Sequence, residues 1–213
     1  MTTVAIARYG AGNVRSVELA FARLGAEMID DLAAADLAVL PGVGSARSAM
    51  EGLGAAADIL RERVAGGRAV LGICLGAQIA LDESEEDGGT PGLGLVSGRA
   101  VRLRDERVPR IGWAPVDPLP APTAPRSTAR ATAAWPSWLP AKAETYWFAH
   151  SYACETDAVV ARSEGHAAII ESGSFTGVQF HPEKSGRAGA RFLHDLLSYR
   201  PGGGGFVGAA SSL

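Results

Sequence analysis

Cys74 stands in a sequence context that is typical of a catalytic nucleophile. It follows the apolar run RAVLGI, residues 68–73, and Gly72 and Gly76 flank it in a glycine-x-cysteine-x-glycine pattern. This is the form of a nucleophile elbow, a strand-to-helix turn so strained and crowded that small residues are needed two positions away on each side. The sulfur would lie at the N-terminus of the following helix, where unpaired amides favour the thiolate. The alternative is a small buried apolar residue, the commonest role of a free cysteine.

His181 and Glu183 could supply the base and the carboxylate that such a nucleophile needs. They belong to GVQFHPE, residues 177–183, where an apolar run ends in histidine, proline and glutamate. Side chains two apart on an extended backbone share a face, and Pro182 disfavours a helix at His181. We therefore expect Glu183 to orient the imidazole as the third member of a triad does. A lone surface histidine, the alternative, explains neither the position nor the proline. His150 lacks such a carboxylate, and we expect it to be a packed residue at a strand end.

The motif PGVGS, residues 41–45, follows directly after the apolar run DLAVL. Glycines at the end of a strand allow a backbone amide to turn toward a substrate, as an oxyanion hole requires. Loops of this composition are usually only turns. The motif therefore gains its weight from the cysteine and histidine motifs that accompany it.

These motifs need a scaffold, and the hydrophobic pattern predicts an α/β fold with a largely parallel sheet. Short apolar runs alternate with helical patterns, which is typical of strands joined by crossover helices. We expect strands at residues 3–7, 26–30, 36–40 and 68–73, and helices over residues 14–24, capped by Asn13 and Gly25, and over residues 45–64. A second, more antiparallel half should contain the runs RAVRL, YWFAHSY, VVARS, HAAIIE and TGVQFH, followed by a last helix over residues 186–199.

The length of 213 residues suits one domain, which we place at residues 1–200. Residues 201–213 form a glycine-rich tail that we expect to be disordered. Residues 114–142 hold seven of the twelve prolines, which predicts an exposed loop.

Composition excludes several classes of function. A formal charge of -3 offers no basic face for nucleic acid, and no apolar run approaches the roughly 20 residues that span a membrane. Two cysteines are too few for a disulfide framework, so we expect a cytoplasmic protein. Cys154, His166 and His194 show no metal-ligand spacing, and we expect neither a metal nor another cofactor.

The motifs PGVGS, GICLGAQ, HSY and GVQFHPEKSG, in this order, resemble those of the class I (triad) glutamine amidotransferases over most of the chain. Within that superfamily, YGAGNVRSV, DESEED, GLGLVSG, RIGW and HPEKSGRAGARFL resemble the glutaminase subunits of imidazole glycerol phosphate synthase, an enzyme of histidine biosynthesis. The resemblance implies a flavodoxin-like sheet flanked by helices. It also implies hydrolysis of L-glutamine to glutamate and ammonia through a thioester on Cys74, with His181 and Glu183 completing the triad.

The resemblance assigns further roles, residue by residue. It implies an oxyanion hole at Gly42, Val43, Gly44 and Leu75, and a glutamine pocket at Gln78, Glu86, Ser151 and Tyr152. It implies a heterodimer with a cyclase subunit that is a (β/α)₈ barrel and receives the ammonia, and it places Trp113 and Lys184 at the interface. Three residues depart from the family pattern: Arg8 stands where aspartate is usual, Arg110 where histidine is usual, and Ala114 where asparagine is usual. None of them is a triad position.

Two alternatives remain open from the sequence. The chain could be the glutaminase subunit of another class I enzyme, such as anthranilate, aminodeoxychorismate or pyridoxal phosphate synthase. It could also be a silent regulatory subunit that keeps the fold without the activity. The motifs YGAGNVRSV and HPEKSG argue against the first, and the intact set of Cys74, His181 and Glu183 argues against the second.

Overall fold

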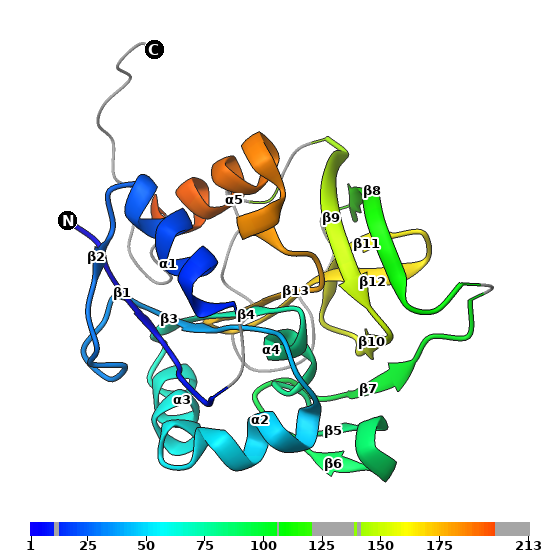
Figure 1. Ribbon diagram of the computed structural model, residues 1–213, viewed down its shortest axis with the longest axis horizontal. Helices are drawn as coiled ribbons and strands as arrows, with labels where there is room; N and C mark the ends of the chain where they lie inside the picture. Colours follow the sequence, from blue (N-terminus) through cyan, green and yellow to red (C-terminus); the bar gives the residue numbers. More distant parts are fainter. Residues whose placement is uncertain (11–12, 106, 121–138, 140–141, 199–213) are drawn as a thin grey trace.

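The computed structural model describes the chain except for residues 11–12, 106, 121–138, 140–141 and 199–213. Among the described residues, nine strands form a main sheet in the order β2-β1-β3-β4-β13-β12-β11-β8-β9 (Figure 1). The parallel half consists of β1 (Thr3–Ile6), β2 (Glu27–Met28), β3 (Leu37–Leu40), β4 (Ala69–Ile73) and β13 (Phe175–Val178). The antiparallel half consists of β12 (His166–Ser172), β11 (Val159–Ser163), β8 (Arg110–Pro118) and β9 (Glu144–His150). The expected α/β class and the presence of a parallel and an antiparallel half are confirmed. Two runs lie elsewhere than we expected: TGVQFH contributes to β13, which pairs in parallel with β4, and RAVRL, residues 99–103, lies outside this sheet.

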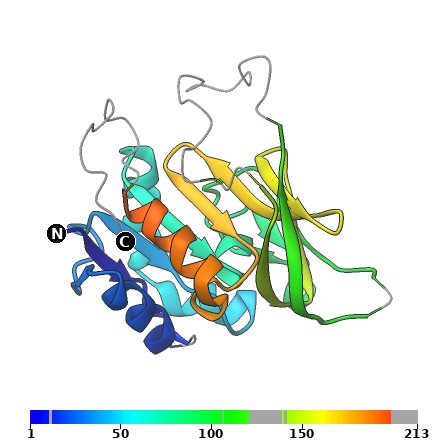
Figure 2. The ribbon, with the colours of Figure 1, turned by 90° about the horizontal axis from the view of Figure 1, so that it is seen from above.

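Helices cover both faces of the parallel half (Figures 1 and 2). On one face lie α1 (Val14–Arg23) and α5 (Gly186–Ser198), and on the other lie α2 (Ala46–Leu53), α3 (Ala56–Ala65) and the one-turn α4 (Leu75–Gln78). Each face has its own apolar cluster: Phe21 and Phe192 pack on the first, and Leu53 and Leu60 on the second. The described residues also include two 3₁₀ turns, η1 (Glu86–Gly88) and η2 (Pro182–Lys184).

A small second sheet of four strands, counted within the described residues, lies beside the main one. Its order is β10-β7-β5-β6, with β10 at Tyr152–Glu155, β7 at Arg99–Arg102, β5 at Glu83–Ser84 and β6 at Thr90–Pro91. The run YWFAHSY, which the pattern predicts as one strand, is therefore two strands in different sheets, separated at Ser151.

Local capping signals agree with the structure at the first helix. The Asn13 side chain accepts a hydrogen bond from the Ser16 amide, and Gly25 adopts φ 79° just beyond the end of the helix. The predicted single helix over residues 45–64 is wrong. Gly54 adopts φ 48° and ψ -128°, which is incompatible with helix, so α2 ends there and α3 starts afresh.

The predicted loop at residues 114–142 is wrong at its start, because β8 continues to Pro118. Ala114 and Val116 alternate into the core, and this burial offsets the handicap of the prolines. On the edge of β8 that faces β11, only Asp117 and Pro118 pair with the neighbouring strand. Most of this edge therefore needs no backbone N–H donor, and a proline there loses little. Residues 121–138, 140–141 and the predicted tail at 201–213 lie outside the described residues.

Candidate active site

Three neighbouring parallel strands end at the candidate motifs. In the order β3-β4-β13, Leu40 lies opposite Gly72, and Ile73 lies opposite Val178. The chain leaves these strands into the PGVGS loop, Cys74 and the QFHPE segment, respectively. Because the carboxyl ends of parallel strands meet at one edge of a sheet, three motifs that are far apart in sequence converge.

Cys74 lies in the strained turn that its flanking glycines indicate. It adopts φ 50° and ψ -107°, a conformation that costs about 1–3 kcal/mol for a residue other than glycine. A Cβ atom at Gly76 would come 2.0 Å from the Leu40 carbonyl oxygen, and one at Gly72 would come 2.8 Å from the Gly76 backbone. Both glycines are therefore required by contact with backbone. The helix that follows is only one turn long, Leu75–Gln78, so its dipole favours the thiolate less than a full helix would.

His181 and Glu183 form a buried pair. The Nδ1 atom of His181 donates to Glu183 Oε1 over 2.9 Å, and the two side chains are 3% and 2% exposed. Burial alone would lower the pKa of His181, but interactions with the Cys74 sulfur and with Glu183 raise this pKa to about 9. The imidazole is thus charged at neutral pH. Since Nδ1 faces Glu183, Nε2 is the ring nitrogen that remains for Cys74.

The reason that we gave for the His181–Glu183 contact is wrong, although the contact exists. Strand β13 ends at Val178, and Glu183 lies within the 3₁₀ turn η2, which Pro182 begins. Proline suits the first position of a helical turn, because a backbone N–H at this position would have no acceptor within the turn. The carboxylate therefore reaches the ring by a tight turn and not by the alternation of a strand.

The sulfur of Cys74 is enclosed by polar groups. Gln179 Nε2 lies 3.5 Å from Sγ, and the carbonyl oxygen of Ala149 lies 3.8 Å from it. Cys74 is 7% exposed and His181 is 2% exposed. Glutamine can reach the sulfur only if the surrounding segments move.

The PGVGS loop packs directly on the elbow. A Cβ atom at Gly42 would lie 1.8 Å from the Ile73 carbonyl oxygen and 2.5 Å from the Leu75 nitrogen. Leu75 is the first residue of α4, a position whose N–H has no acceptor within the helix. The Tyr9 hydroxyl donates to the Pro41 carbonyl at the start of this loop. The loop that carries the predicted oxyanion donors is therefore restrained by the first residue of the YGAGNVRSV motif, to which sequence reasoning assigned no such role. The other loop glycine, Gly44, adopts φ 114°.

The four residues predicted for the glutamine pocket fall into two groups. Gln78 is buried and donates from Nε2 to the Tyr152 carbonyl over 2.7 Å, which brings Tyr152 beside the helix that follows Cys74; Ser151 directly precedes Tyr152 in the chain. Glu86 instead accepts the Ala46 amide over 2.8 Å at the start of α2, and burial raises the pKa of this carboxyl. It therefore anchors the helix that follows the PGVGS loop.

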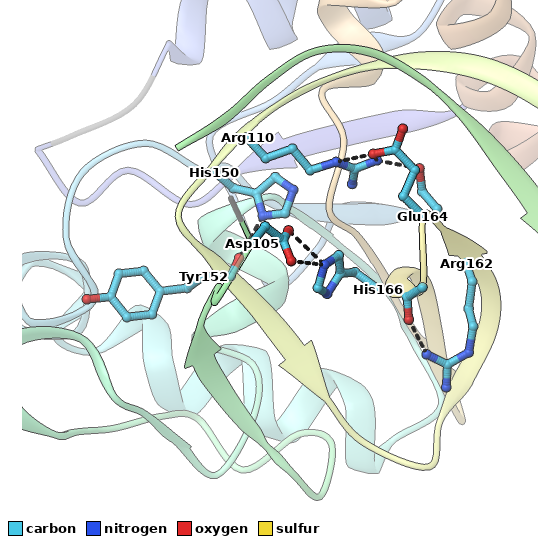
Figure 3. Close-up of polar contacts among 9 residues, drawn as sticks. Asp105, Arg110, His150, Tyr152, Arg162, Glu164 and His166 are labelled. Carbon is cyan, nitrogen blue, oxygen red and sulfur yellow. Dashed lines mark hydrogen bonds and ion pairs between the residues drawn. The ribbon is translucent and has the colours of Figure 1, made fainter. Parts of the chain in front are cut away.

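His150 is the packed strand-end residue that we expected. It ends β9, is 5% exposed, and hydrogen-bonds the Tyr152 carbonyl through Nδ1 over 2.8 Å. Figure 3 shows Arg110, one of the departures from the family pattern, extending past this ring toward Glu164. The guanidinium pairs with Glu164 at 2.9 Å and lies 4.2 Å from the centre of the Phe148 ring. The positive charge and the burial both lower the pKa of His150, burial having the larger effect.

The other two departures lie away from the triad. Arg8 forms an ion pair with Glu18, and Ala114 is buried in β8. Of the predicted interface residues, Trp113 is 54% exposed on β8 and contacts Trp147 edge to face at 5.9 Å, while Lys184 is exposed in η2.

Two side chains near the triad were missed by the sequence reasoning. Gln179 contacts the sulfur, and Ser185 accepts the Trp147 amide while donating to the His181 carbonyl over 2.6 Å. A signal for Gln179 was present, because it stands two residues before His181 at the end of an extended run. Ser185 offered no such signal, since it acts through backbone groups.

A cavity of about 890 Å³ lies elsewhere, between the second sheet and the β11–β12 hairpin, and its lining includes Arg102, Cys154 and His166 but no triad residue. In the part of the chain that the structure describes, no three His, Cys, Asp or Glu side chains gather as a metal site would need. No helix among the same residues has both the length and the apolar character needed to cross a membrane.

Comparison with known proteins identifies similar chains. A sequence model of the family described as glutamine amidotransferase class-I matches residues 3–197. The chain is 39% identical to the imidazole glycerol phosphate synthase subunit HisH of Symbiobacterium thermophilum, over 94% of this chain and 99% of that protein. It is 38% identical to the protein of the same name from Methanothermobacter thermautotrophicus, over 91% of this chain and 97% of that protein.

Two solved structures from Thermotoga maritima share the fold. The structure of PurLQS has a TM-score of 0.67 at 20% identity and covers 93% of this chain and 99% of its own. A glutamine amidotransferase has a TM-score of 0.58 at 18% identity and covers 90% of this chain and 80% of its own. At these identities the likeness concerns the fold alone.

Proposed function

The chain belongs to the class I glutamine amidotransferase family, and we propose that it is the glutaminase subunit of an imidazole glycerol phosphate synthase. Residues 1–200 are assigned to one amidotransferase domain. The named relatives support this choice because their similarity extends over nearly the full length of both chains. The observation that carries the chemistry is the buried pair of His181 and Glu183 beside a cysteine in a strained elbow.

In the proposed reaction, the Cys74 thiolate attacks the side-chain amide carbon of glutamine. The resulting tetrahedral oxyanion collapses, the carbon–nitrogen bond breaks, and the His181 imidazolium gives its proton to the departing ammonia. A glutamyl thioester is left on Cys74. Water then adds to the thioester carbon while His181 takes its proton, and glutamate leaves as the thiolate re-forms. Glu183 keeps Nδ1 protonated, so that Nε2 carries out both proton transfers.

The oxyanion would be held by the Leu75 amide and by amides of the loop at Gly42, Val43 and Gly44. In the described structure the Tyr9 hydroxyl donates to the Pro41 carbonyl and so restrains the loop that carries these amides. This arrangement supports a low rate of glutamine hydrolysis for the isolated chain. Gln78, Glu86, Ser151 and Tyr152 would line the substrate pocket, with Glu86 acting from its place at the start of α2.

The proposed partner is a cyclase subunit with a (β/α)₈ barrel that forms a heterodimer with this chain and consumes the ammonia. Ammonia becomes protonated in water and then cannot act as a nucleophile, so direct transfer between subunits has a chemical advantage. The interface would include Lys184 and the exposed apolar residues of β8, where Ile111 is 63% exposed and Trp113 is 54% exposed. Residues of this kind are enriched at protein–protein interfaces. A cytoplasmic location suits the proposal, because the thiol of Cys74 must stay reduced.

The test uses the complex of the full chain with the cyclase subunit from the same organism. With Cys74→Ala, glutamine should no longer support formation of imidazole glycerol phosphate, whereas added ammonium salt should still do so. Cys154→Ala is the matched control, since Cys154 is the other cysteine and lines the separate cavity, which includes no triad residue, and it should keep glutamine-dependent activity. Retained glutamine turnover in Cys74→Ala would refute the assignment of the nucleophile.

The same assay tests partner control and the choice of enzyme. Glutamate release by the isolated chain should be slow and should rise at least tenfold with the liganded cyclase subunit. Full activity of the isolated chain would contradict partner control. Failure of the pair to make imidazole glycerol phosphate from either nitrogen source would favour another class I enzyme instead.

A further inference from the structure

Gln179 contacts the sulfur of Cys74 from a position that no triad role requires. It follows β13 directly, is 2% exposed, and its Nε2 atom lies 3.5 Å from Sγ. Its Oε1 atom lies 3.1 Å from Nε2 of Gln78, which also contacts the Tyr152 carbonyl oxygen at 2.7 Å. The three residues thus form a buried chain of hydrogen bonds that ends at the nucleophile.

The direction of this chain follows from its far end. The Tyr152 carbonyl can only accept a hydrogen bond, so the end of the Gln78 carboxamide that faces it must be Nε2. The second proton of that nitrogen points to Gln179, whose facing atom must then be the acceptor Oε1. The opposite end of the Gln179 carboxamide, its N–H₂ group, therefore faces the sulfur. A flip of either amide would place two acceptors or two donors against each other.

A neutral N–H donor favours a thiolate over a thiol, because hydrogen bonds to an ionised acceptor are stronger than those to a neutral one. This matters here because α4 is a single turn and supplies little dipole. The donor also differs from His181 in that it does not lose its proton during the reaction. It is in place when the thiolate attacks and again when the thiolate leaves the thioester.

We propose that Gln179 is a further catalytic residue, which donates a hydrogen bond to the Cys74 sulfur and stabilises its thiolate in both steps of glutamine hydrolysis. Gln78 is the positioning residue that fixes the orientation of the Gln179 amide. The proposal rests on the proposed function of Cys74 as nucleophile. It adds a group that stabilises the charge of the nucleophile and makes no claim on the substrate.

The decisive experiment measures the rate of Cys74 alkylation by iodoacetamide as a function of pH in the full chain, with the modified peptide identified by mass spectrometry. Burial raises the pKa of the Cys154 thiol to about 12, so this second cysteine should stay unmodified. Gln179→Leu removes the donor and retains a side chain of similar size. It should move the midpoint of the alkylation profile up by about 1–2 pH units, because a hydrogen bond to a charged group has that strength.

Gln179→Glu is the second variant, and it keeps the shape of the side chain while placing a carboxylate oxygen against the sulfur. It should shift the midpoint at least as far as Gln179→Leu. Both variants should lower kcat for glutamine about tenfold or more at neutral pH, with KM changed less, and should keep ammonia-dependent activity with the partner. That activity and thermal unfolding show which variants fold.

The outcomes separate the two proposals. Alkylation profiles of folded Gln179→Leu and Gln179→Glu that coincide with the wild-type profile would overturn the role of Gln179 and leave the function of Cys74 intact. If Cys74→Ala retains glutamine turnover, the proposed function is refuted, and the role of Gln179, which rests on it, is refuted with it. If Gln179→Leu does not fold, Gln179→Met takes its place, because it also removes the N–H donor and adds no charge.

Discussion

Burial of His150 should make the stability of this protein depend on pH in a range where few other groups titrate. Burial, together with the charges of Arg110, His166 and His181, lowers the pKa of His150 to about 4, although the Tyr152 carbonyl opposes this shift. Its Nε2 atom is buried without a hydrogen-bond partner, so a proton added there would have no acceptor. The unfolded chain has no such obstacle, and its histidine takes up a proton near pH 6.5.

The sign and the size follow from these two values. Because the folded pKa is depressed, the stability is fully present above pH 6.5 and is lost as the pH falls toward 4. Each unit of difference corresponds to about 1.4 kcal/mol, so the free energy of unfolding should fall by about 2 kcal/mol between pH 7 and pH 4.5 through His150 alone. Since β9 turns into β10 at this residue, the Ser151–Tyr152 segment should be the first part of the site to loosen.

Urea unfolding of the wild-type chain and of His150→Asn, measured from pH 4.5 to pH 7.5, isolates this effect. Asparagine can place its N–H₂ group near the Nδ1 position and so keep the bond to the Tyr152 carbonyl, but it does not titrate. The variant should be less stable than the wild type at pH 7, because a smaller side chain fills the site. On acidification, however, its free energy of unfolding should fall by about 2 kcal/mol less than that of the wild type. His194→Asn is the control, because it makes the same substitution at a histidine whose side chain is 65% exposed. Identical pH dependence in the wild type and His150→Asn would refute the reasoning.

Two further predictions concern groups outside the triad. Arg63 is 2% exposed and donates to five backbone carbonyls, those of Leu32, Ala33, Ala35, Asp36 and Ala69. In urea unfolding, Arg63→Met should therefore lower the free energy of unfolding by about 3 kcal/mol. The control Arg61→Met, on the same helix, should lower it by about 1 kcal/mol or less. Tyr9→Phe removes the hydrogen bond from the Tyr9 hydroxyl to the Pro41 carbonyl, which restrains the start of the oxyanion loop. It should raise glutamate production by the isolated chain about fivefold, as the loss of one hydrogen bond would; an unchanged or lower rate would argue against a restraining role for Tyr9.

Much of the scaffold could be predicted because its signals are local. The Asn13 cap, the glycine after α1 and the alternation of strands with helices each depend on a few adjacent residues, and the structure agrees with them. The convergence of the three motifs follows from the parallel arrangement of β3, β4 and β13, whose carboxyl ends meet at one edge of the sheet. The sequence pattern did not predict it, because that pattern assigned TGVQFH to the antiparallel half.

Two of the failures arose because a single local signal was compatible with two conformations. Pro182 suits both an extended residue before it and a 3₁₀ turn after it, and the structure has the turn. Pro115 and Pro118 are typical of a loop, yet the core contacts of Ala114 and Val116 stabilise a strand. The contacts of Ser185 with the site failed to be predicted for a different reason, since they depend on tertiary approach, which a motif does not encode.

The strain at Cys74 and the geometry around it have the same source. The Cys74 amide donates to the Val178 carbonyl over 2.7 Å, so the neighbouring strand β13 holds the residue from one side. On the other side, the PGVGS loop approaches so closely that Gly42 has no room for a Cβ atom beside the Ile73 carbonyl. A strained conformation persists only where its surroundings determine it more than once, and here strand β13 and the PGVGS loop both do so. The same close approach sets the separation between the sulfur and the loop amides. The backbone contact that maintains the strain therefore also positions the proposed oxyanion donors relative to the nucleophile.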